Sequence, residues 1–209
     1  MLIFVENITN RLKYTFDFIF KERDLTYEFT TNQELFINSN SPKFNYSRES
    51  FDIKIHSLIP SSILFREGVY NFSINKNLFN HEECLTINDK TDPFASIFYI
   101  LTRYEEYNST LIDQHGRHQG KHSVLYRFNW HLQSKCDRWA EDILAFFKEN
   151  CGFKYDKKIY HPQIIPTFDI DKAYAYKHKG IIRNILSNIK DLWTKNTKQL
   201  IERKLVISG

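Results

Sequence analysis

The sequence predicts an α/β protein, with a small accessory domain over residues 1–155 and the first strand and helix of a second domain over residues 156–209. Two observations favour this class. Short apolar runs alternate with stretches of helical spacing in the first third of the chain. Further along, a short run of strand-forming residues leads into a pair of aspartates. Because 42% of the 209 residues are hydrophobic, we expect a core and exclude a disordered chain.

The N-terminal residues predict a strand, a helix and a second strand. Leu2–Val5 is a short apolar run, as in a buried strand. Apolar residues then recur at helical spacing, and Asn7 or Thr9 is the expected N-cap. These apolar positions are Ile8, Leu12, Phe16, Ile19 and Phe20. Leu25–Thr30 alternates in the manner of a strand.

The next residues predict a turn and two more strands. Residues 38–42 have the composition of a turn. Phe51, Ile53 and Ile55 alternate with charged residues, which indicates a half-buried strand. Ile63–Phe65 precedes Arg66-Glu67-Gly68 and indicates a further short strand ending in a turn.

Two amphipathic helices are expected in the middle of the chain. Asp92 and Pro93 suit the N-cap and the first helical position of one of them. Its apolar face comprises Phe94, Ile97, Phe98, Leu101 and Tyr104. The second helix ends near Cys151-Gly152. Its apolar face comprises Cys136, Trp139, Ala140, Ile143, Leu144 and Phe147, with Trp139 expected in the core.

Residues 108–127 lack periodicity and contain three histidines. His118 and His122 are four residues apart, which would suit zinc on a helix, but Gly116 and Gly120 argue against a helix there. For Asp113-Gln114-His115-Gly116-Arg117 we expect a fixed turn, in which Arg117 or His115 bonds to the backbone or to an acid.

The candidate catalytic residues lie in a short apolar run that ends in two aspartates, Ile164-Ile165-Pro166-Thr167-Phe168-Asp169-Ile170-Asp171. In an extended strand, Asp169 and Asp171 point to the same side. Two adjacent carboxylates repel each other unless a cation or a shared proton relieves the repulsion. A divalent metal beside a free carboxylate can activate water. A solvated turn or a helix N-cap is the alternative interpretation of the same residues.

A last helix is expected beyond this run. Its apolar positions are Ile181, Ile182, Ile185, Leu186, Ile189 and Trp193. Left without a partner, such a face favours self-association. Basic residues exceed acidic ones after residue 176, and a solvated helix face explains this excess better than nucleic acid or a membrane.

Two regions of the chain resemble the polysaccharide deacetylase family, in the bacterial branch that has an extra N-terminal domain. The first catalytic motif of that family resembles Thr167-Phe168-Asp169-Ile170-Asp171. The branch is indicated by residues 92–107, Asp-Pro-Phe-Ala-Ser-Ile-Phe-Tyr-Ile-Leu-Thr-Arg-Tyr-Glu-Glu-Tyr, and by Asp113-Gln114-His115-Gly116-Arg117. The resemblance extends from about residue 44 onward.

The resemblance implies a metal-dependent hydrolase acting on acetylated sugars, such as a cell-envelope glycan. It assigns the role of general base to Asp169 and the role of metal ligand to Asp171. The metal is divalent, and zinc is expected. The family's aspartate pair is contiguous, whereas Ile170 intervenes here, so Asp171 is favoured by its same-side geometry.

The resemblance also implies a truncated enzyme. The family's second motif has two histidines four residues apart, and His178 is the only histidine after Asp171. About 40 residues cannot supply the remaining strands of a deacetylase barrel. We therefore expect an accessory domain joined to the start of a catalytic domain, inactive by itself and without a tightly bound metal.

Two other classes remain open. A non-catalytic α/β module that binds sugar or a partner protein would use some of the aromatic residues, which make up 16% of the chain. A metal-dependent nuclease would use Asp52-Ile53-Lys54 on a strand, but no companion acid is identifiable. A net charge of +4 does not by itself indicate nucleic acid.

The location of the protein is expected to be cytoplasmic. Cys84, Cys136 and Cys151 are odd in number, match no metal-binding spacing and are expected to be reduced. Met1–Val5 is too short for the apolar part of a secretory signal, and no run is long enough for a membrane span.

Overall fold

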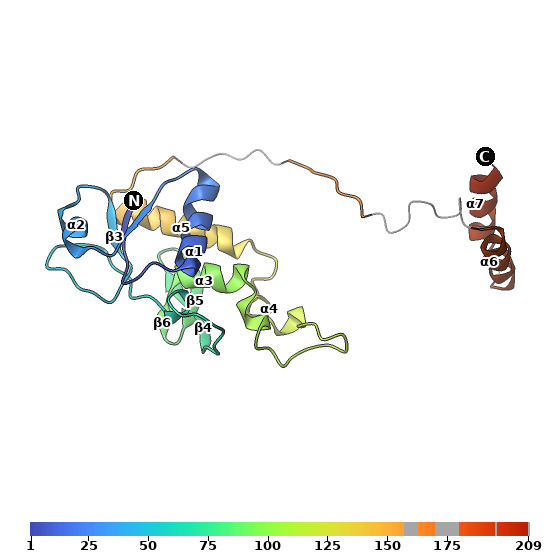
Figure 1. Cartoon of the computed structure of the whole chain (residues 1–209), viewed down its shortest axis with the longest axis horizontal. Coiled ribbons are helices and arrows are strands. Elements are labelled where there is room, and N and C mark those ends of the chain that lie inside the picture. The colour runs from blue at the N-terminus through green and yellow to red at the C-terminus, as the bar shows by residue number, and fades with distance from the viewer. Residues whose placement is uncertain (157–162, 170–179, 195, 209) are drawn as a thin grey trace. The chain divides into compact units, whose positions relative to one another are not determined.

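The computed structural model describes residues 1–156, 163–169, 180–194 and 196–208 (Figure 1). The chain divides into two compact units, Met1–Ile159 and Tyr160–Gly209. Unit 1 has mixed helices and small sheets, so the predicted α/β class is confirmed for it.

A three-stranded parallel sheet is formed by the N-terminal residues of unit 1. Its strands are β1 (Leu2–Phe4), β2 (Glu28–Thr30) and β3 (Lys43–Asn45), in the order β2-β1-β3. Ile3 lies opposite Phe29 on one side and Phe44 on the other. The connections contain helices α1 (Asn10–Phe20) and α2 (Gln33–Asn38). Parallel neighbours need such crossover connections.

The central strand β1 is buried on both faces of this sheet. Ile3 and the following Val5 belong to the large core, which also contains the apolar side of α1. Leu2 and Phe4 belong to a second small cluster with Phe36 of α2. Alternate residues of a strand point to opposite faces, so the sheet lies between the two clusters. An all-apolar strand such as β1 suits this position.

Helix α1 begins where the sequence indicates. Thr9 is its N-cap, and the Thr9 hydroxyl accepts a hydrogen bond from the Leu12 N–H at 3.1 Å. The same hydroxyl donates to the Leu64 carbonyl at 2.6 Å. Thr9 therefore both caps the helix and joins it to Leu64, which is distant in the sequence.

An antiparallel sheet follows in the chain, formed by β4 (Ile74–Phe79), β5 (Glu82–Ile87) and β6 (Lys90–Thr91). Asn88 and Asp89 join β5 to β6, and both have positive φ angles, 46° and 65°. Two left-handed residues in a two-residue loop are typical of a tight hairpin turn.

Helices α3 (Pro93–Leu101) and α5 (Lys135–Asn150) complete the core. Asp92 caps α3 and Pro93 occupies its first turn, as the sequence predicts. Gly152, with φ of 68°, follows the end of α5. Trp139 of α5 is buried, and its indole N–H donates to the Glu83 carbonyl at 2.7 Å. Its predicted place in the core is confirmed.

Short elements connect these parts of unit 1. They are the 3₁₀ turns η1 (Lys21–Arg23), η2 (Ser62–Leu64), η3 (Tyr104–Glu106) and η4 (Gly120–His122), and the helix α4 (Val124–Arg127).

Two predicted strands are wrong. Residues 51–55 form no strand, and Phe51 and Ile55 instead pack from a loop against the Phe36 cluster. Asp52 and Lys54 are exposed on this loop, so the half-motif considered for a nuclease does not lie on a strand. The Ile63–Phe65 run contributes to η2, in which Ile63 and Leu64 are fully buried. A short apolar run indicates burial but does not distinguish a strand from a turn of helix.

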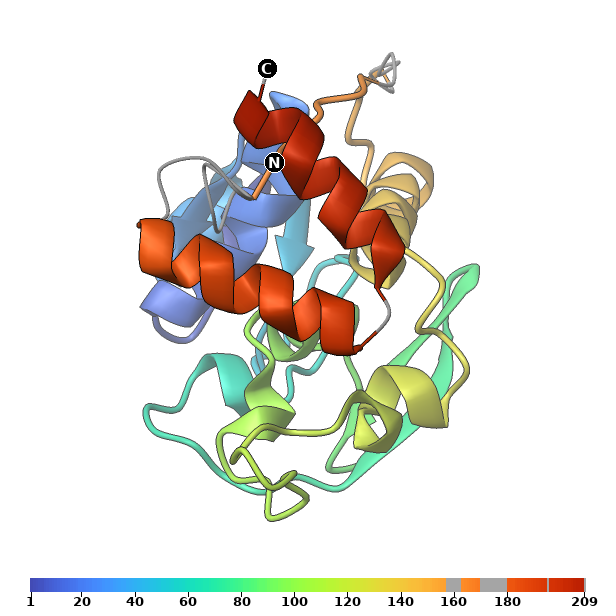
Figure 2. The same cartoon turned by 90° about the vertical axis from the view of Figure 1, so that its right-hand side faces the viewer.

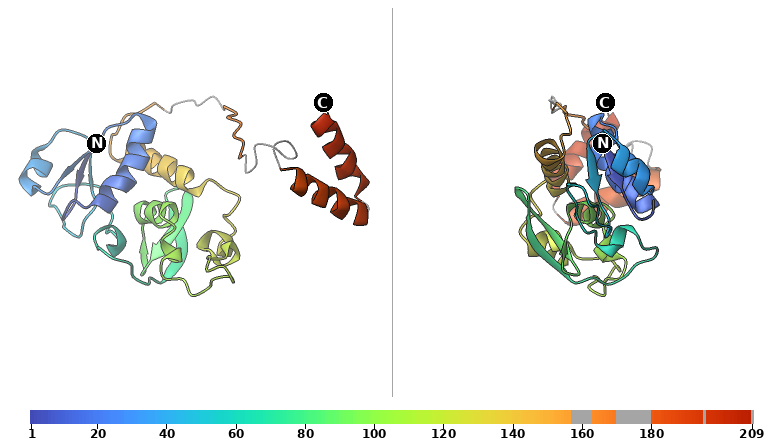
Figure 3. Two further views of the ribbon diagram at one scale, coloured as in Figure 1. Left: turned by 45° about the vertical axis from the view of Figure 1, so that its right-hand side comes forward. Right: turned by 90° about the vertical axis from the view of Figure 1, so that its left-hand side faces the viewer.

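Unit 2 contains helices α6 (Ile181–Trp193) and α7 (Thr197–Ser208), which form a helical hairpin (Figure 3). The predicted helix over residues 181–193 is confirmed, whereas α7 was not predicted. Among the described residues, no helix is long and apolar enough to cross a membrane.

Candidate functional site

The segment with the predicted catalytic base is not a strand. Residues 163–169 have no regular secondary structure and are exposed, Asp169 included. Ile164 is 95% exposed and Phe168 is 83% exposed. The prediction of a buried strand here is wrong for this chain, because no described strand pairs with the segment.

The predicted metal ligand, Asp171, lies outside the described residues, as does the intervening Ile170. Asp169 is therefore the one member of the predicted pair that has a described position. Among residues 1–156, 163–169, 180–194 and 196–208, no group of three His, Cys, Asp or Glu side chains could hold a metal ion. Zinc needs three protein ligands or more, so these residues do not fit it, and we assign no step to a metal here.

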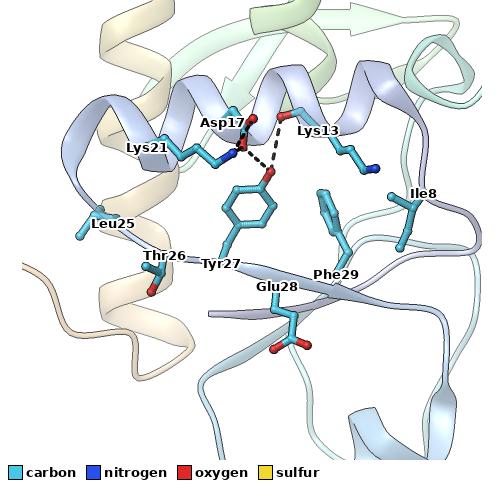
Figure 4. Close-up of a pocket in the computed structure, with 9 residues that line it drawn as sticks. All are labelled: Ile8, Lys13, Asp17, Lys21, Leu25, Thr26, Tyr27, Glu28 and Phe29. Atoms are coloured by element: carbon cyan, nitrogen blue, oxygen red, sulfur yellow. Dashed lines mark hydrogen bonds and ion pairs between the residues drawn. The ribbon is translucent and has the colours of Figure 1, made fainter.

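A groove of about 470 Å³ lies between α1 and β2 (Figure 4). Tyr27 and Phe29 point toward α1, whereas Glu28 points away from the helix (Figure 4). Lys13 and Lys21 lie along the helical side of the groove. Aromatic rings and charged groups are thus brought together on the surface of unit 1.

Asp17, Lys21 and Tyr27 of this groove are paired with one another. The Tyr27 hydroxyl lies 2.7 Å from Asp17 Oδ1, and the Lys21 ammonium lies 2.9 Å from the same carboxylate. Partial burial opposes ionisation of Asp17, but the hydrogen bonds from Lys21 and Tyr27 outweigh it and hold the pKa of Asp17 below its usual value. Burial and the Asp17 carboxylate raise the pKa of Tyr27. Tyr27 is therefore a neutral donor and not a base.

Strand β2 is at the edge of the parallel sheet, so one of its two sides has no neighbouring strand in that sheet. The Glu28 N–H donates to the Met1 carbonyl and the Val5 N–H donates to the Thr30 carbonyl. Backbone groups of alternate residues point to opposite edges of a strand, so those of Phe29 point away from β1. An outer strand with unpaired backbone groups can accept a further strand from a partner.

The first residues of the long resembling stretch have a structural role. The Asp92 carboxylate is fully buried and accepts hydrogen bonds from the Ala95 N–H at 3.0 Å, the Ser61 N–H at 2.8 Å and the Tyr46 hydroxyl at 2.7 Å. Burial raises the pKa of Asp92 in spite of these donors. Ser96 accepts from the Leu85 N–H at 2.9 Å and so joins α3 to β5.

The later residues of that stretch hold loops in place. The Tyr104 hydroxyl accepts from the Tyr70 N–H at 2.9 Å, and the Glu105 carboxylate accepts from the Val124 N–H at 2.9 Å. Asp113 accepts from the N–H groups of His115 at 2.8 Å and Arg117 at 3.0 Å, and it pairs with the Arg117 guanidinium at 3.2 Å. The predicted fixed turn, with Arg117 bonded to an acid, is confirmed.

The histidines of this loop do not converge. His118 Nδ1 lies 2.8 Å from the Ser109 hydroxyl, and His122 lies in η4. His115 is exposed. The three cysteines, Cys84, Cys136 and Cys151, are unpaired. Burial raises the pKa of each of their thiols to about 12, which makes them poor nucleophiles at neutral pH.

Sequence reasoning missed one carboxylate that organises unit 1. Asp142 of α5 accepts from Asn80 Nδ2 at 3.1 Å, the His81 N–H at 3.1 Å and the Glu82 N–H at 3.3 Å. It therefore fastens the turn of the β4–β5 hairpin to α5. The turn residues Asn80-His81 between two runs of six residues were the available signal.

A comparison with protein families assigns the chain to a family. The fold defines unit 1 as a mixed α/β domain with a parallel and an antiparallel sheet. The model of a family of unknown function, DUF7033, matches residues 1–151, and the chain belongs to this family. No match was found among curated proteins or solved structures.

Proposed function

We propose that this chain is the N-terminal portion of a metal-dependent polysaccharide deacetylase-like hydrolase that acts on acetylated sugars. Unit 1 is its accessory domain, and Asp169 is the base that removes a proton from the attacking water. Asp171 is proposed as a ligand of the metal, with the remaining ligands supplied outside the described residues.

The observation that supports this proposal is the exposed apolar run before Asp169. Each large apolar side chain of Ile164–Phe168 would gain ~1.5–3 kcal/mol on full burial, so this run favours a position inside a sheet. Strand formers ending in a carboxylate are expected where a catalytic group is placed at the end of a barrel strand. In the described part of unit 2, this run is in no strand and its large apolar side chains are exposed.

The encoding locus, read past the codon for Gly209, tests the proposal. A reading frame that continues, directly or after a frameshift, into a His-x-x-x-His motif would support it. A stop codon followed by unrelated sequence would contradict it. The purified chain is expected to release no acetate from acetylated chitooligosaccharides or peptidoglycan, and strong metal-dependent release would contradict the proposed need for further residues.

The groove between α1 and β2 favours a second candidate, a non-catalytic module that binds carbohydrate or protein. Its aromatic wall and the backbone groups of Phe29, which point away from β1, suit a sugar ring or an added peptide strand. Titration with chitooligosaccharides and with strand-forming peptides, followed by NMR of the Tyr27 and Phe29 amides, tests it. Shifts confined to this groove that are lost in Phe29→Ala would favour the module.

A further inference from the structure

Helix α6 has an apolar side that α7, the other described helix of unit 2, does not cover. Its apolar residues recur at intervals of one, three and four, so they lie on one side of the helix. Their exposed fractions are 77% for Ile182, 53% for Ile185, 61% for Leu186, 56% for Ile189 and 90% for Trp193. A patch of this kind marks an interaction surface.

Helices α6 and α7 lie next to each other (Figure 2), and Asn188 and Asp191, which contact α7, are on the side of α6 opposite its apolar residues. Arg203 of α7 lies 2.6 Å from the Asp191 carboxylate and donates to Asn188 Oδ1 at 2.7 Å. Arg203 and Asp191 are each 6% exposed. A buried ion pair thus joins the two helices, and α7 does not cover the apolar side of α6. A hairpin that built its own core would bury that side between its helices.

Both helices of the hairpin carry exposed cations. Arg183 and Lys190 of α6 and Lys198 and Lys204 of α7 are all exposed. Within 180–194 and 196–208 the acidic residues are Asp191, which is buried against Arg203, and Glu202. The exposed surface of the hairpin is therefore basic.

We propose that α6 binds the surface of a bilayer that contains anionic phospholipids. The helix lies in the plane of the interface, with its apolar side among the acyl chains and its cations at the headgroups. Its 13 residues span about 20 Å, too short to cross a bilayer core of ~30 Å. An apolar protein partner would account for the exposed apolar residues alone, whereas anionic headgroups also match the exposed cations of the two helices. This proposal does not depend on the proposed catalytic function.

Trp193 reports on this surface without added labels. The chain has three tryptophans. Trp130 and Trp139 are 3% and 1% exposed, whereas Trp193 is 90% exposed. Quenching of fluorescence by acrylamide therefore acts chiefly on Trp193. Insertion of α6 would shift its emission to shorter wavelength and protect it from the quencher.

The test is sedimentation of the full chain with vesicles, accompanied by Trp193 quenching. We expect binding to phosphatidylcholine vesicles that contain phosphatidylglycerol, little binding to phosphatidylcholine alone, and weaker binding as salt is added. Replacing Arg183→Gln together with Lys190→Gln should lower the partition coefficient roughly thirty-fold, ~1 kcal/mol for each residue. Ile185→Ser with Ile189→Ser should abolish Trp193 protection.

Lys121→Gln with Leu132→Ser is the matched control, because both residues are exposed in unit 1. It should bind as the unchanged chain does. All variants should keep the same thermal midpoint, since they change exposed side chains. Absence of vesicle binding would overturn the proposal, as would equal binding to phosphatidylcholine alone. A blue shift of Trp193 that grows with protein concentration without vesicles would also overturn it, in favour of a second copy of the chain.

Discussion

Asp92 joins three parts of unit 1 through one buried carboxylate. It accepts hydrogen bonds from the first turn of α3, from the loop before η2 and from Tyr46 after β3. Burying a carboxylate costs less free energy when hydrogen-bond donors surround it than when they are absent. Its charged form is still less favourable there than in water. Its ionisation should therefore be visible in the stability of the protein.

Replacement of Asp92→Asn should change how stability depends on pH. Burial raises the folded-state pKa of Asp92 above its unfolded value of about 3.9. The stabilisation linked to protonated Asp92 is present below the unfolded pKa and is lost as pH rises through the folded pKa, by at most ~1.4 kcal/mol per pH unit. The unfolding free energy of the unchanged chain should thus fall relative to that of Asp92→Asn between about pH 4 and the raised pKa.

Urea denaturation at a series of pH values measures this difference. Asp52→Asn is the control, because Asp52 is exposed on a loop. Its stability should follow that of the unchanged chain at each pH. Parallel curves for the unchanged chain and Asp92→Asn would show that the buried carboxyl titrates as it does in the unfolded state.

The roles of some residues in unit 1 can be predicted from the sequence, and those of others cannot. Thr9 and Asp92 were predictable as caps because an N-cap depends on neighbours within three residues. The other partners of these residues, Leu64 for Thr9 and Tyr46 for Asp92, are 55 and 46 residues away along the chain. No local pattern reveals such contacts. Asp169 was proposed from a motif, and its present exposure was not predictable from the motif alone.

At the scale of elements, the β4–β5 hairpin depends on α5. Asp142 of α5 accepts hydrogen bonds from three donors at the hairpin turn. The same turn has Asn80 at a φ of 42°. The turn is thus held by contacts from another element as well as by its own conformation.

Asp142→Ala should lower the unfolding free energy by ~2–4 kcal/mol, because three half-buried donors at the turn would lose their acceptor. Chemical denaturation followed by far-UV circular dichroism measures the loss. Asp137→Ala on the same helix is the control, since Asp137 is largely exposed and meets Arg23 at 3.3 Å. Its effect should stay within about 0.5 kcal/mol. Equal effects of the two substitutions would contradict the role given to Asp142.

The elements were predictable to different extents for a physical reason. Helices α3, α5 and α6 have long periodic apolar faces and clear ends, so their existence follows from the sequence. Residues 51–55 alternate as a strand does, yet they have no strand neighbour and pack as a loop on Phe36. A strand forms only beside a neighbouring strand, and the local sequence does not show whether such a neighbour exists.

At the scale of the whole molecule, the two units differ in how their apolar residues are used. Unit 1 encloses a continuous core that includes residues of both sheets and of α1, α3 and α5. The described part of unit 2 leaves the apolar side of α6 and the Ile164–Phe168 run exposed. Unit 1 should therefore fold without unit 2.

A polypeptide of residues 1–156 should unfold in one cooperative transition, with an unfolding free energy within about 1 kcal/mol of the value for residues 1–209. The physical reason is that its core contains no described residue of unit 2. Calorimetry and urea denaturation of both polypeptides measure this. A loss of several kcal/mol in the shorter polypeptide would show that unit 2 contributes to the core.

The proposed catalytic function depends most directly on Asp169 as the general base. A general base contributes typically 10²–10⁴-fold to the rate of the step it assists. In Asp169→Asn the side chain keeps its size and loses its capacity to take a proton. The substitution should leave stability unchanged, because Asp169 is exposed in this chain.

The measurement to make is acetate release from acetylated chitooligosaccharides by the polypeptide of the complete reading frame, with zinc, for the unchanged sequence and for Asp169→Asn. The account predicts release that is abolished by a chelator and falls at least about a hundred-fold in Asp169→Asn, with substrate binding retained. No release, or equal release by both proteins, would contradict the assignment of Asp169 as the base of a metal-dependent deacetylase.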